Sequence, residues 1–192
     1  MKNPTDQPLN NALSERWSPY AFDPRREVNP EDLAAVFEAA RWSASSYNAQ
    51  PWRYIVGVRN RGQAAWDQVF DVLLEGNQPW AKNAPVLAIG LAEHNFEHNG
   101  KPNKAALHDL GAASASLTVE ATTRGLVVHQ MIGIDPDKAR TVFNLGGTIE
   151  PLTALAIGYA GDAGSVDEEY AKRDSKKRER KPIGEIIIQG GF

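Results

Sequence analysis

The sequence lacks cysteine altogether and holds only two methionines among its 192 residues. Without cysteine there can be no disulfide bridge, thiolate metal site, iron–sulfur cluster or cysteine nucleophile, and this fits a reducing, cytoplasmic location. Basic residues number 21 against 24 acidic ones, so the net charge is −3. No overall basic field therefore attracts nucleic acid or an anionic membrane. No segment approaches the roughly 20 apolar residues of a membrane-spanning helix, and the polar residues 1–11 lack the apolar core of a signal peptide.

The composition that is present suits a folded domain. Hydrophobic residues make up 42% of the chain and charged residues 23%, which are ordinary values for a globular protein. The length predicts a single domain spanning residues 1–192, with a charged C-terminal arm over about residues 165–192.

Helices and strands alternate in the hydrophobic pattern, which predicts a helix-covered sheet of the α+β class. Asn29 and Pro30 mark one helix start, because Asn caps free N–H groups and Pro suits the first helical position. Helical spacing predicts helices over residues 30–41, 66–74, 107–121 and 135–143. Apolar runs predict strands over residues 54–58, 86–91, 126–128, 152–160 and 185–189. We expect strand 54–58 to be central, because it is apolar on both faces. The terminal strand must add to an edge of this sheet or of another protomer's.

Three polar segments are candidates for a binding site. The loop over residues 43–53 carries hydroxyl and amide side chains that suit a polar ligand, although the same residues could satisfy only local backbone groups. Arg16 and Ser18 alternate in extended chain and could grip a phosphate or carbonyl, or Arg16 could simply be solvated. Arg178 and Arg180 alternate in the same way within a basic run, which could equally be a solvated face.

Two other patterns favour no ligand. His94 and His98 lie four residues apart, but the order is not His-Glu-x-x-His and no third ligand is identifiable, so we expect no metal site. Gly158, Gly161 and Gly164 follow a strand with the wrong spacing for a dinucleotide fingerprint, and they predict a turn.

Taken together, the three polar segments resemble motifs of the nitroreductase family of FMN-dependent NAD(P)H oxidoreductases. The resemblance covers about residues 13–189. The family's opening Arg-x-Ser-x-basic-x-Phe is matched by Arg16, Ser18 and Phe22, with Tyr20 at the basic position. Its Pro-Ser-Ser-x-Asn-x-Gln-Pro-Trp stretch begins with Ala44 in place of proline and is otherwise matched by Ser45, Ser46, Asn48, Gln50, Pro51 and Trp52.

The resemblance implies a nitroreductase-like three-layer α-β-α sandwich with a mixed sheet. It also implies an intertwined homodimer that exchanges the C-terminal strand and holds FMN at the interface. Arg16, Ser18, Arg178 and Arg180 would contact the flavin, the arginines chiefly at its dianionic phosphate. Ile132 and Gly133 would face flavin N5, and Asn77 would bind the ring. Ser45, Ser46, Asn48 and Gln50 would reach it from the other protomer.

The implied activity is hydride transfer from NADH or NADPH through the flavin to a nitroaromatic, quinone or related small molecule, by a ping-pong mechanism. Because the cofactor performs the chemistry, no catalytic side chain is expected. Trp80 is a candidate wall for flat substrates, although it could also be a core aromatic. Two alternatives stay open: a flavin-binding or flavin-sequestering protein without efficient turnover, and a dimeric interaction module that binds an acidic partner through its basic segment.

Overall fold

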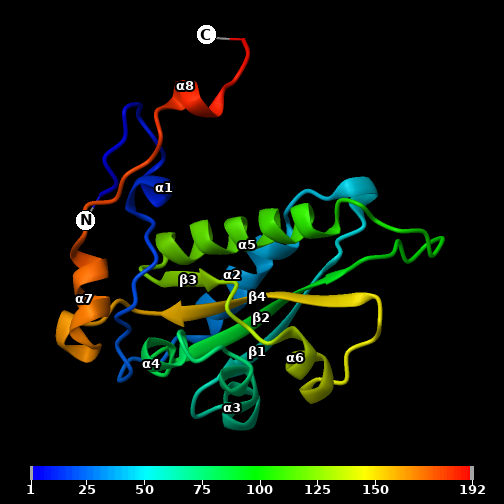
Figure 1. The fold of residues 1–192 in the computed structure, drawn as a ribbon, viewed down its shortest axis with the longest axis horizontal. Helices are drawn as coiled ribbons and strands as arrows, with labels where there is room; N and C mark the ends of the chain where they lie inside the picture. Colours follow the sequence, from blue (N-terminus) through cyan, green and yellow to red (C-terminus); the bar gives the residue numbers. More distant parts are fainter. Residues whose placement is uncertain (1, 191–192) are drawn as a thin grey trace.

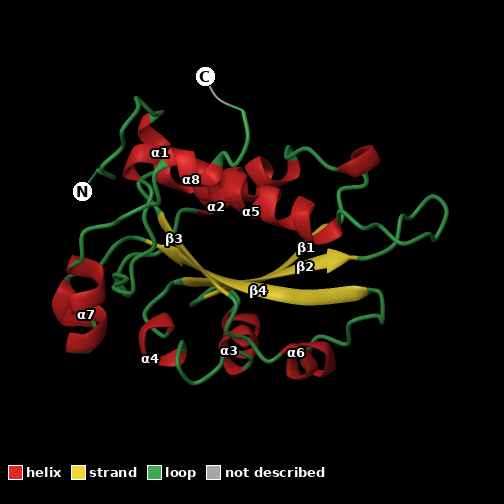
Figure 2. Cartoon of the chain, turned by 45° about the horizontal axis from the view of Figure 1, so that its top comes forward, coloured by secondary structure: helices red, strands yellow, loops and turns green. Residues whose placement is uncertain are grey.

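Four strands form the central sheet of the computed structural model, which describes residues 2–190. They are β1 (Trp52–Val58), β2 (Val86–Glu93), β3 (Val127–Met131) and β4 (Ile149–Gly158). Their order is β1-β2-β4-β3, and each neighbouring pair is antiparallel. Helices cover both faces of the sheet (Figure 2), so the predicted α+β class and three-layer sandwich are confirmed. The predicted mixed sheet is not found among the described residues of one chain, because all three strand pairs are antiparallel.

The helices divide between the two faces of the sheet (Figures 1 and 2). One face carries α1 (Asn11–Glu15), α2 (Pro30–Arg41) and α5 (Ala106–Thr123), and the other carries α3 (Gln63–Asp71), α4 (Gln78–Ala81) and α6 (Pro136–Val142). The remaining helices are two short 3-10 turns, η1 (Ser46–Asn48) and η2 (Ala163–Ser165), and two C-terminal helices, α7 (Glu168–Ser175) and α8 (Ile183–Ile186). None of the helices in residues 2–190 is both long and apolar enough to cross a membrane.

Local sequence signals explain the two longest helices. The Asn29 side chain accepts a hydrogen bond from the Glu31 N–H at 2.9 Å, which caps α2 as predicted. In α5, apolar side chains at helical spacing are almost completely buried between the helix and the sheet: Leu110, Ala113, Leu117 and Ala121. These two helices pack against each other and form one wall of the core.

Strand positions in the sheet differ from the sequence-based expectation at one point. β2 is the buried, central strand, with every residue from Val86 to Ala92 buried. β1 is an edge strand, so the prediction that strand 54–58 is central was wrong. Its two faces are apolar because α3 packs on one and α2 and α5 lie over the other, while one of its edges stays unpaired. A strand can therefore be covered by helices on both faces and still lack a neighbouring strand on one side.

Residues 185–189 form no strand within this chain, so the predicted terminal strand does not add to the chain's own sheet. Residues Ile183–Ile186 form the short helix α8, and Ile187 and Ile188 follow without a strand partner. The segment extends away from the sheet (Figure 1), and Ile186 and Ile188 are 68% and 93% exposed. A β-branched run forms a strand only when a strand edge is within hydrogen-bonding reach, and this chain offers none there.

Candidate functional site

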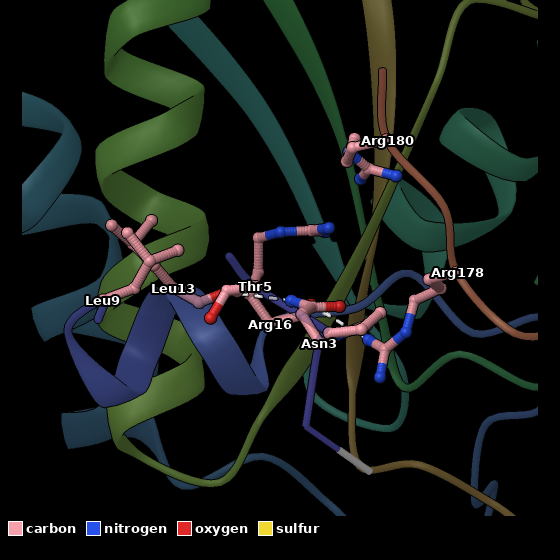
Figure 3. Close-up of a pocket in the computed structure, with 8 residues that line it drawn as sticks. Asn3, Thr5, Leu9, Leu13, Arg16, Arg178 and Arg180 are labelled. Carbon is pink, nitrogen blue, oxygen red and sulfur yellow. Dashed lines mark hydrogen bonds between the residues drawn. The ribbon is translucent and has the colours of Figure 1, made fainter. Parts of the chain in front are cut away.

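Three arginines from the two ends of the chain meet at one cavity of about 220 Å³. Arg16 follows α1, whereas Arg178 and Arg180 lie on the arm after α7. Figure 3 shows the side chains of Arg16 and Arg180 reaching the cavity, with the guanidinium of Arg178 turned toward the Arg16 main chain. Arg178 Nη1 donates a hydrogen bond to the Arg16 carbonyl at 3.1 Å. The structure therefore brings together three of the four residues predicted for a phosphate corner, and Ser18 adjoins them.

The electrostatics of this corner favour an anion. Burial, and then repulsion from Arg180 and Arg178, lowers the pKa of Arg16. Burial and the charge of Arg180 likewise lower the pKa of Arg178. Like charges held this close destabilise one another. A bound dianion would relieve that repulsion, because it attracts all three guanidinium groups at once.

A second cavity of about 270 Å³ adjoins the first and shares Leu13 and Arg16 with it. Arg16 Nη1 donates to Ser18 Oγ at 3.3 Å on this side. Polar groups come from β3 and α5, where Gln130 Nε2 donates to Thr118 Oγ1 at 2.9 Å. The rest of the lining is mostly aliphatic. A ligand with an anionic end and a larger uncharged body suits such a pair of neighbouring cavities.

Asn77 and Gly133, predicted from separate parts of the sequence, are in direct contact. Asn77 Nδ2 donates to the Gly133 carbonyl at 3.0 Å. A Cβ atom on Gly133 would lie 2.3 Å from Asn77 Nδ2, so this approach requires glycine. The neighbouring Ile132 directly follows β3 and is 73% exposed, so it is available to a ligand or a second chain.

The loop with Ser45, Ser46, Asn48 and Gln50 lies far from the arginines. It sits near the N-terminal end of α5, whereas α1 and the arginine arm lie toward the opposite end of that helix (Figure 1). Ser45 Oγ accepts from the Gln50 N–H at 3.0 Å, and the Ser46 N–H donates to Asp109 at 3.0 Å. Within this chain, some of these polar groups thus bind local partners.

The same loop has a strained backbone. Tyr47, Asn48 and Gln50 all have positive φ angles of 47–54°, in a region that non-glycine residues rarely adopt. Such strain persists only where the surroundings fix it, and it is common at ligand-binding segments. Tyr47 is 88% exposed and Asn48 also faces solvent, so the loop presents its tip outward.

Trp80 does not line an open pocket. Its side chain is completely buried in the core, with its ring centroid 5.3 Å from that of Tyr20 and 4.4 Å from that of His129. The prediction of a substrate wall was wrong, because α4 turns this ring under the N-terminal arm rather than toward the surface. The alternative, a core aromatic, is what the structure contains.

The two histidines of the 93–103 loop do not meet. His94 Nε2 pairs with Glu150 on β4, and His98 Nε2 lies 2.9 Å from Asn99 Nδ2. Within residues 2–190, no group of three or more His, Cys, Asp or Glu side chains is placed to hold a metal ion.

Several site residues were missed by the sequence analysis. Asn3 and Thr5 line the arginine cavity, and Asn3 Nδ2 donates to the Leu13 and Arg16 carbonyls at 3.0 Å each. Thr118 and Gln130 line the second cavity as site side chains. Gln130, a polar residue within the apolar strand β3, carried a usable signal, whereas Asn3 in a polar N-terminal segment carried none.

Comparisons with known proteins agree on one family. A model described as the nitroreductase family matches residues 13–159. The major NAD(P)H-flavin oxidoreductase of Aliivibrio fischeri is 37% identical over 79% of this chain and 87% of its own length. An uncharacterised 15.4 kDa protein of Mycolicibacterium smegmatis is 34% identical over 72% of this chain and 95% of its own length. A crystal structure described as an oxidoreductase containing FMN superposes with a TM-score of 0.90 at 30% identity, covering 99% of this chain and 96% of that one.

Proposed function

This chain belongs to the nitroreductase family, and on that basis we propose that it is an FMN-dependent oxidoreductase that passes hydride from NADH or NADPH to a small-molecule acceptor. Its relatives include a protein named as an NAD(P)H-flavin oxidoreductase and a structural neighbour that contains FMN. The acceptor class we propose is a nitroaromatic, a quinone or a related flat molecule. Donor and acceptor would use the same site in turn, which gives ping-pong kinetics.

The convergence of Arg16, Arg178 and Arg180 carries this proposal. A flavin mononucleotide ends in a phosphate that is largely dianionic at neutral pH, and guanidinium groups are its natural partners. The adjoining cavity, with Ser18 in its lining, has mostly aliphatic walls and a few polar groups, which suits the ribityl chain. The donor set and the lining of the two cavities thus fit the phosphate and ribityl part of FMN.

The residues of this chain have distinct proposed roles around the cofactor. FMN, when bound, supplies the hydride chemistry. The arginines hold its phosphate, and the Asn77 amide binds a polar edge of the ring. The main-chain N–H groups of Ile132 and Gly133 would hydrogen-bond the ring near N5. No side chain of the protein needs to act as a nucleophile or as a general acid or base. Binding and orientation of the cofactor and substrate are therefore the protein's main contribution.

We further propose that the complete site needs two copies of the chain. Ser45, Ser46, Asn48 and Gln50 belong to the predicted ring site, yet one chain holds them far from its own arginines. In a homodimer, the loop of one protomer can reach the site of the other. The outward-facing, strained tip at Tyr47 and Asn48 supports this arrangement.

The C-terminal segment supports the same dimer. Ile186 and Ile188 are 68% and 93% exposed in their own chain, and β1 offers an unpaired edge among the described residues. A mainly apolar cavity of about 430 Å³ lies beside that edge, between α2 and β1. We propose that residues 185–189 become a strand when they pair with the edge of a second protomer's sheet. This one contact would bury the exposed isoleucines and pair the free backbone N–H and C=O groups at the edge of β1.

The decisive experiment is optical. The purified protein is incubated with FMN, passed through a desalting column and examined for the visible flavin bands. It is then mixed anaerobically with NADH or NADPH, and bleaching of the bands indicates reduction. Re-oxidation by nitroaromatic, quinone and free-flavin acceptors in turn identifies the acceptor class.

Each outcome separates the proposal from its alternatives. Flavin bands that bleach with either nucleotide support the oxidoreductase. Flavin bands that never bleach indicate a flavin-binding protein without turnover. A protein that retains no flavin contradicts the proposal and favours an interaction module, whose binding to an acidic partner would weaken steeply with salt.

A further inference from the structure

Asp174 joins the two arms that carry the arginines. It lies in the last turn of α7, and its carboxylate accepts hydrogen bonds from the main-chain N–H groups of Tyr20 and Ala21. The Tyr20 N–H lies 2.9 and 3.1 Å from the two carboxylate oxygens, and the Ala21 N–H lies 3.0 Å from one of them. A carboxylate bound to two consecutive N–H groups is a strong, directional anchor.

The anchor lies between the arginines in sequence and fixes their relative position. Tyr20 is four residues after Arg16, and Asp174 is four residues before Arg178. Beyond the anchor, Arg178 donates to the Arg16 carbonyl at 3.1 Å, and its guanidinium lies 5.8 Å from the Trp17 ring centroid. The two arms therefore run side by side from the anchor to the cavity.

We propose that Asp174 is a positioning residue for phosphate binding, which holds Arg178 and Arg180 against Arg16 without neutralising them. The inference rests on the proposed binding of FMN. The Asp174 carboxylate can do this because it binds neutral main-chain N–H groups rather than the guanidinium groups. Within residues 2–190, neither Arg16 nor Arg180 forms an ion pair, so their charge stays available to a ligand.

An anchor of this kind is needed because the arginines repel one another. Much of the arm beyond α7 is solvated: Lys176, Lys177 and Lys181 are exposed, and α8 buries no residue. Without Asp174, repulsion between Arg180 and Arg16 would drive the arm away from the cavity. Part of the binding free energy of FMN would then be used to return the arm to the cavity, so the affinity for FMN would fall.

The rest of α7 should stay in place when Asp174 is changed. The Tyr170 hydroxyl donates to the Gly76 carbonyl at 3.2 Å, and Asn83 donates to the Ser165 carbonyl at 2.7 Å. Both contacts join the start of the arm to the helix layer around α4. An Asp174→Asn variant should therefore fold, and its circular dichroism spectrum and melting temperature check this directly.

The test compares FMN with riboflavin, which has the same ring and ribityl chain but no phosphate. Binding is followed by quenching of flavin fluorescence in the wild type, Asp174→Asn and Asp174→Glu. Glu168→Gln is the matched control, since it removes an exposed carboxylate from the same helix. We expect Asp174→Asn to weaken FMN binding by about tenfold or more, the loss of a charge-assisted hydrogen bond. Riboflavin binding should stay within about twofold, and Asp174→Glu should recover part of the FMN affinity.

The outcomes separate this inference from the function on which it rests. Equal losses for FMN and riboflavin would mean a general structural role and overturn the positioning role, as would unchanged FMN affinity in Asp174→Asn. A wild-type protein that binds neither flavin would overturn the proposed function itself. In that case hydrogen exchange at the Tyr20 and Ala21 N–H groups still tests their bonds to Asp174. Unchanged protection of these groups in Asp174→Asn would show that the carboxylate does not hold this segment.

Discussion

Gly133 sets the separation between the two segments of the proposed ring site. Replacement with alanine places a Cβ atom 2.3 Å from Asn77 Nδ2, so the amide must move away and lose its hydrogen bond to the Gly133 carbonyl. The displaced atom is the end of a flexible side chain, so we expect Gly133→Ala to cost less than about 1 kcal/mol in unfolding free energy. Flavin affinity should fall by about tenfold, to a similar extent for FMN and riboflavin, because the ring rather than the phosphate loses its partner.

Fluorescence titration and urea unfolding measure the two effects of Gly133→Ala. Gly146→Ala is the matched control, because a Cβ atom there meets nothing within 4 Å. Unchanged affinity for both flavins in Gly133→Ala would show that this contact does not belong to the ring site.

His129 makes stability depend on pH near neutrality. Pro19 offers only a carbonyl oxygen, so Nδ1 of His129 must donate in their 2.9 Å hydrogen bond. Burial lowers the pKa of His129 below its usual 6.5, against smaller opposing effects from the Pro19 carbonyl and Asp174. The unfolded chain thus binds a proton at a higher pH than the folded chain. The stability that neutral His129 contributes is fully present above pH 6.5 and is lost as the pH falls below it toward the folded pKa.

The change His129→Phe tests this dependence while keeping an aromatic ring beside Trp80. We expect urea unfolding to show a smaller loss of stability in the variant than in the wild type between about pH 7.5 and about pH 5.5. His98→Asn, in an exposed loop, should behave like the wild type. An equal pH dependence in wild type and His129→Phe would contradict the prediction.

Side chains whose role follows from a continuous motif could be predicted, whereas those that depend on the direction of a chain turn could not. Arg16 and Arg180 are 164 positions apart, and only their resemblance to a family motif linked them before the structure placed them together. The residues next to Trp80 in the sequence do not indicate whether its ring faces a pocket or the core. Its burial follows from packing against Tyr20 and His129, both distant in sequence.

At the scale of elements, local signals predicted the main helices and the four strands of the sheet, whereas the position of a strand within the sheet depends on non-local pairing. The capped start of α2 and the continuous apolar run of β2 are properties of short segments, and both were correct. β1 is at the edge because only β2 pairs with it among the described residues, and no local signal in β1 itself indicates this. The isoleucine-rich segment 185–189 has strand propensity, but a strand also requires a partner edge, which the sequence of one chain cannot specify.

The C-terminal segment is expected to act in assembly rather than in the stability of one chain. Because Ile186 and Ile188 are exposed in the chain, Ile186→Asp together with Ile188→Asp should change its unfolding free energy by no more than about 1 kcal/mol. If these side chains become buried against a second protomer, the pair should weaken dimerisation by more than about a hundredfold. Light scattering across a dilution series measures the dimer, with Ile186→Leu as the conservative control. Equal dimer affinity in the Asp variant would exclude this segment from the interface.

At the scale of the whole molecule, the two halves of the predicted flavin site occupy opposite ends of α5. The arginine corner requires the N- and C-terminal arms, while the Ser45–Gln50 loop is attached near the start of α5 through Asp109. If these residues form the proposed flavin site, a single chain would bind the phosphate without enclosing the ring with its own loop. In the proposed dimer each protomer would complete the other's site, so cofactor binding and dimerisation would stabilise one another.

Mixed dimers can show directly whether each site takes residues from two chains. Arg16→Ala damages the phosphate corner, and Asn48→Ala damages the loop, so each homodimer should bind FMN at least about tenfold more weakly than the wild type. In a dimer of one Arg16→Ala chain and one Asn48→Ala chain, a shared site would combine both defects at one position and leave the other intact. Co-expression with two different affinity tags isolates this mixed dimer, which should bind one FMN with wild-type affinity.

A site built within one chain predicts a different result. Every site in the mixed dimer would then carry one of the two defects, and no FMN would bind with wild-type affinity. The control is a dimer of one wild-type chain and one chain with both substitutions. With shared sites it carries one defect at each site and binds weakly, whereas with separate sites it keeps one intact site. With shared sites only the first mixed dimer keeps an intact FMN site, whereas with separate sites only the second one does. Comparing the two dimers therefore decides between the models.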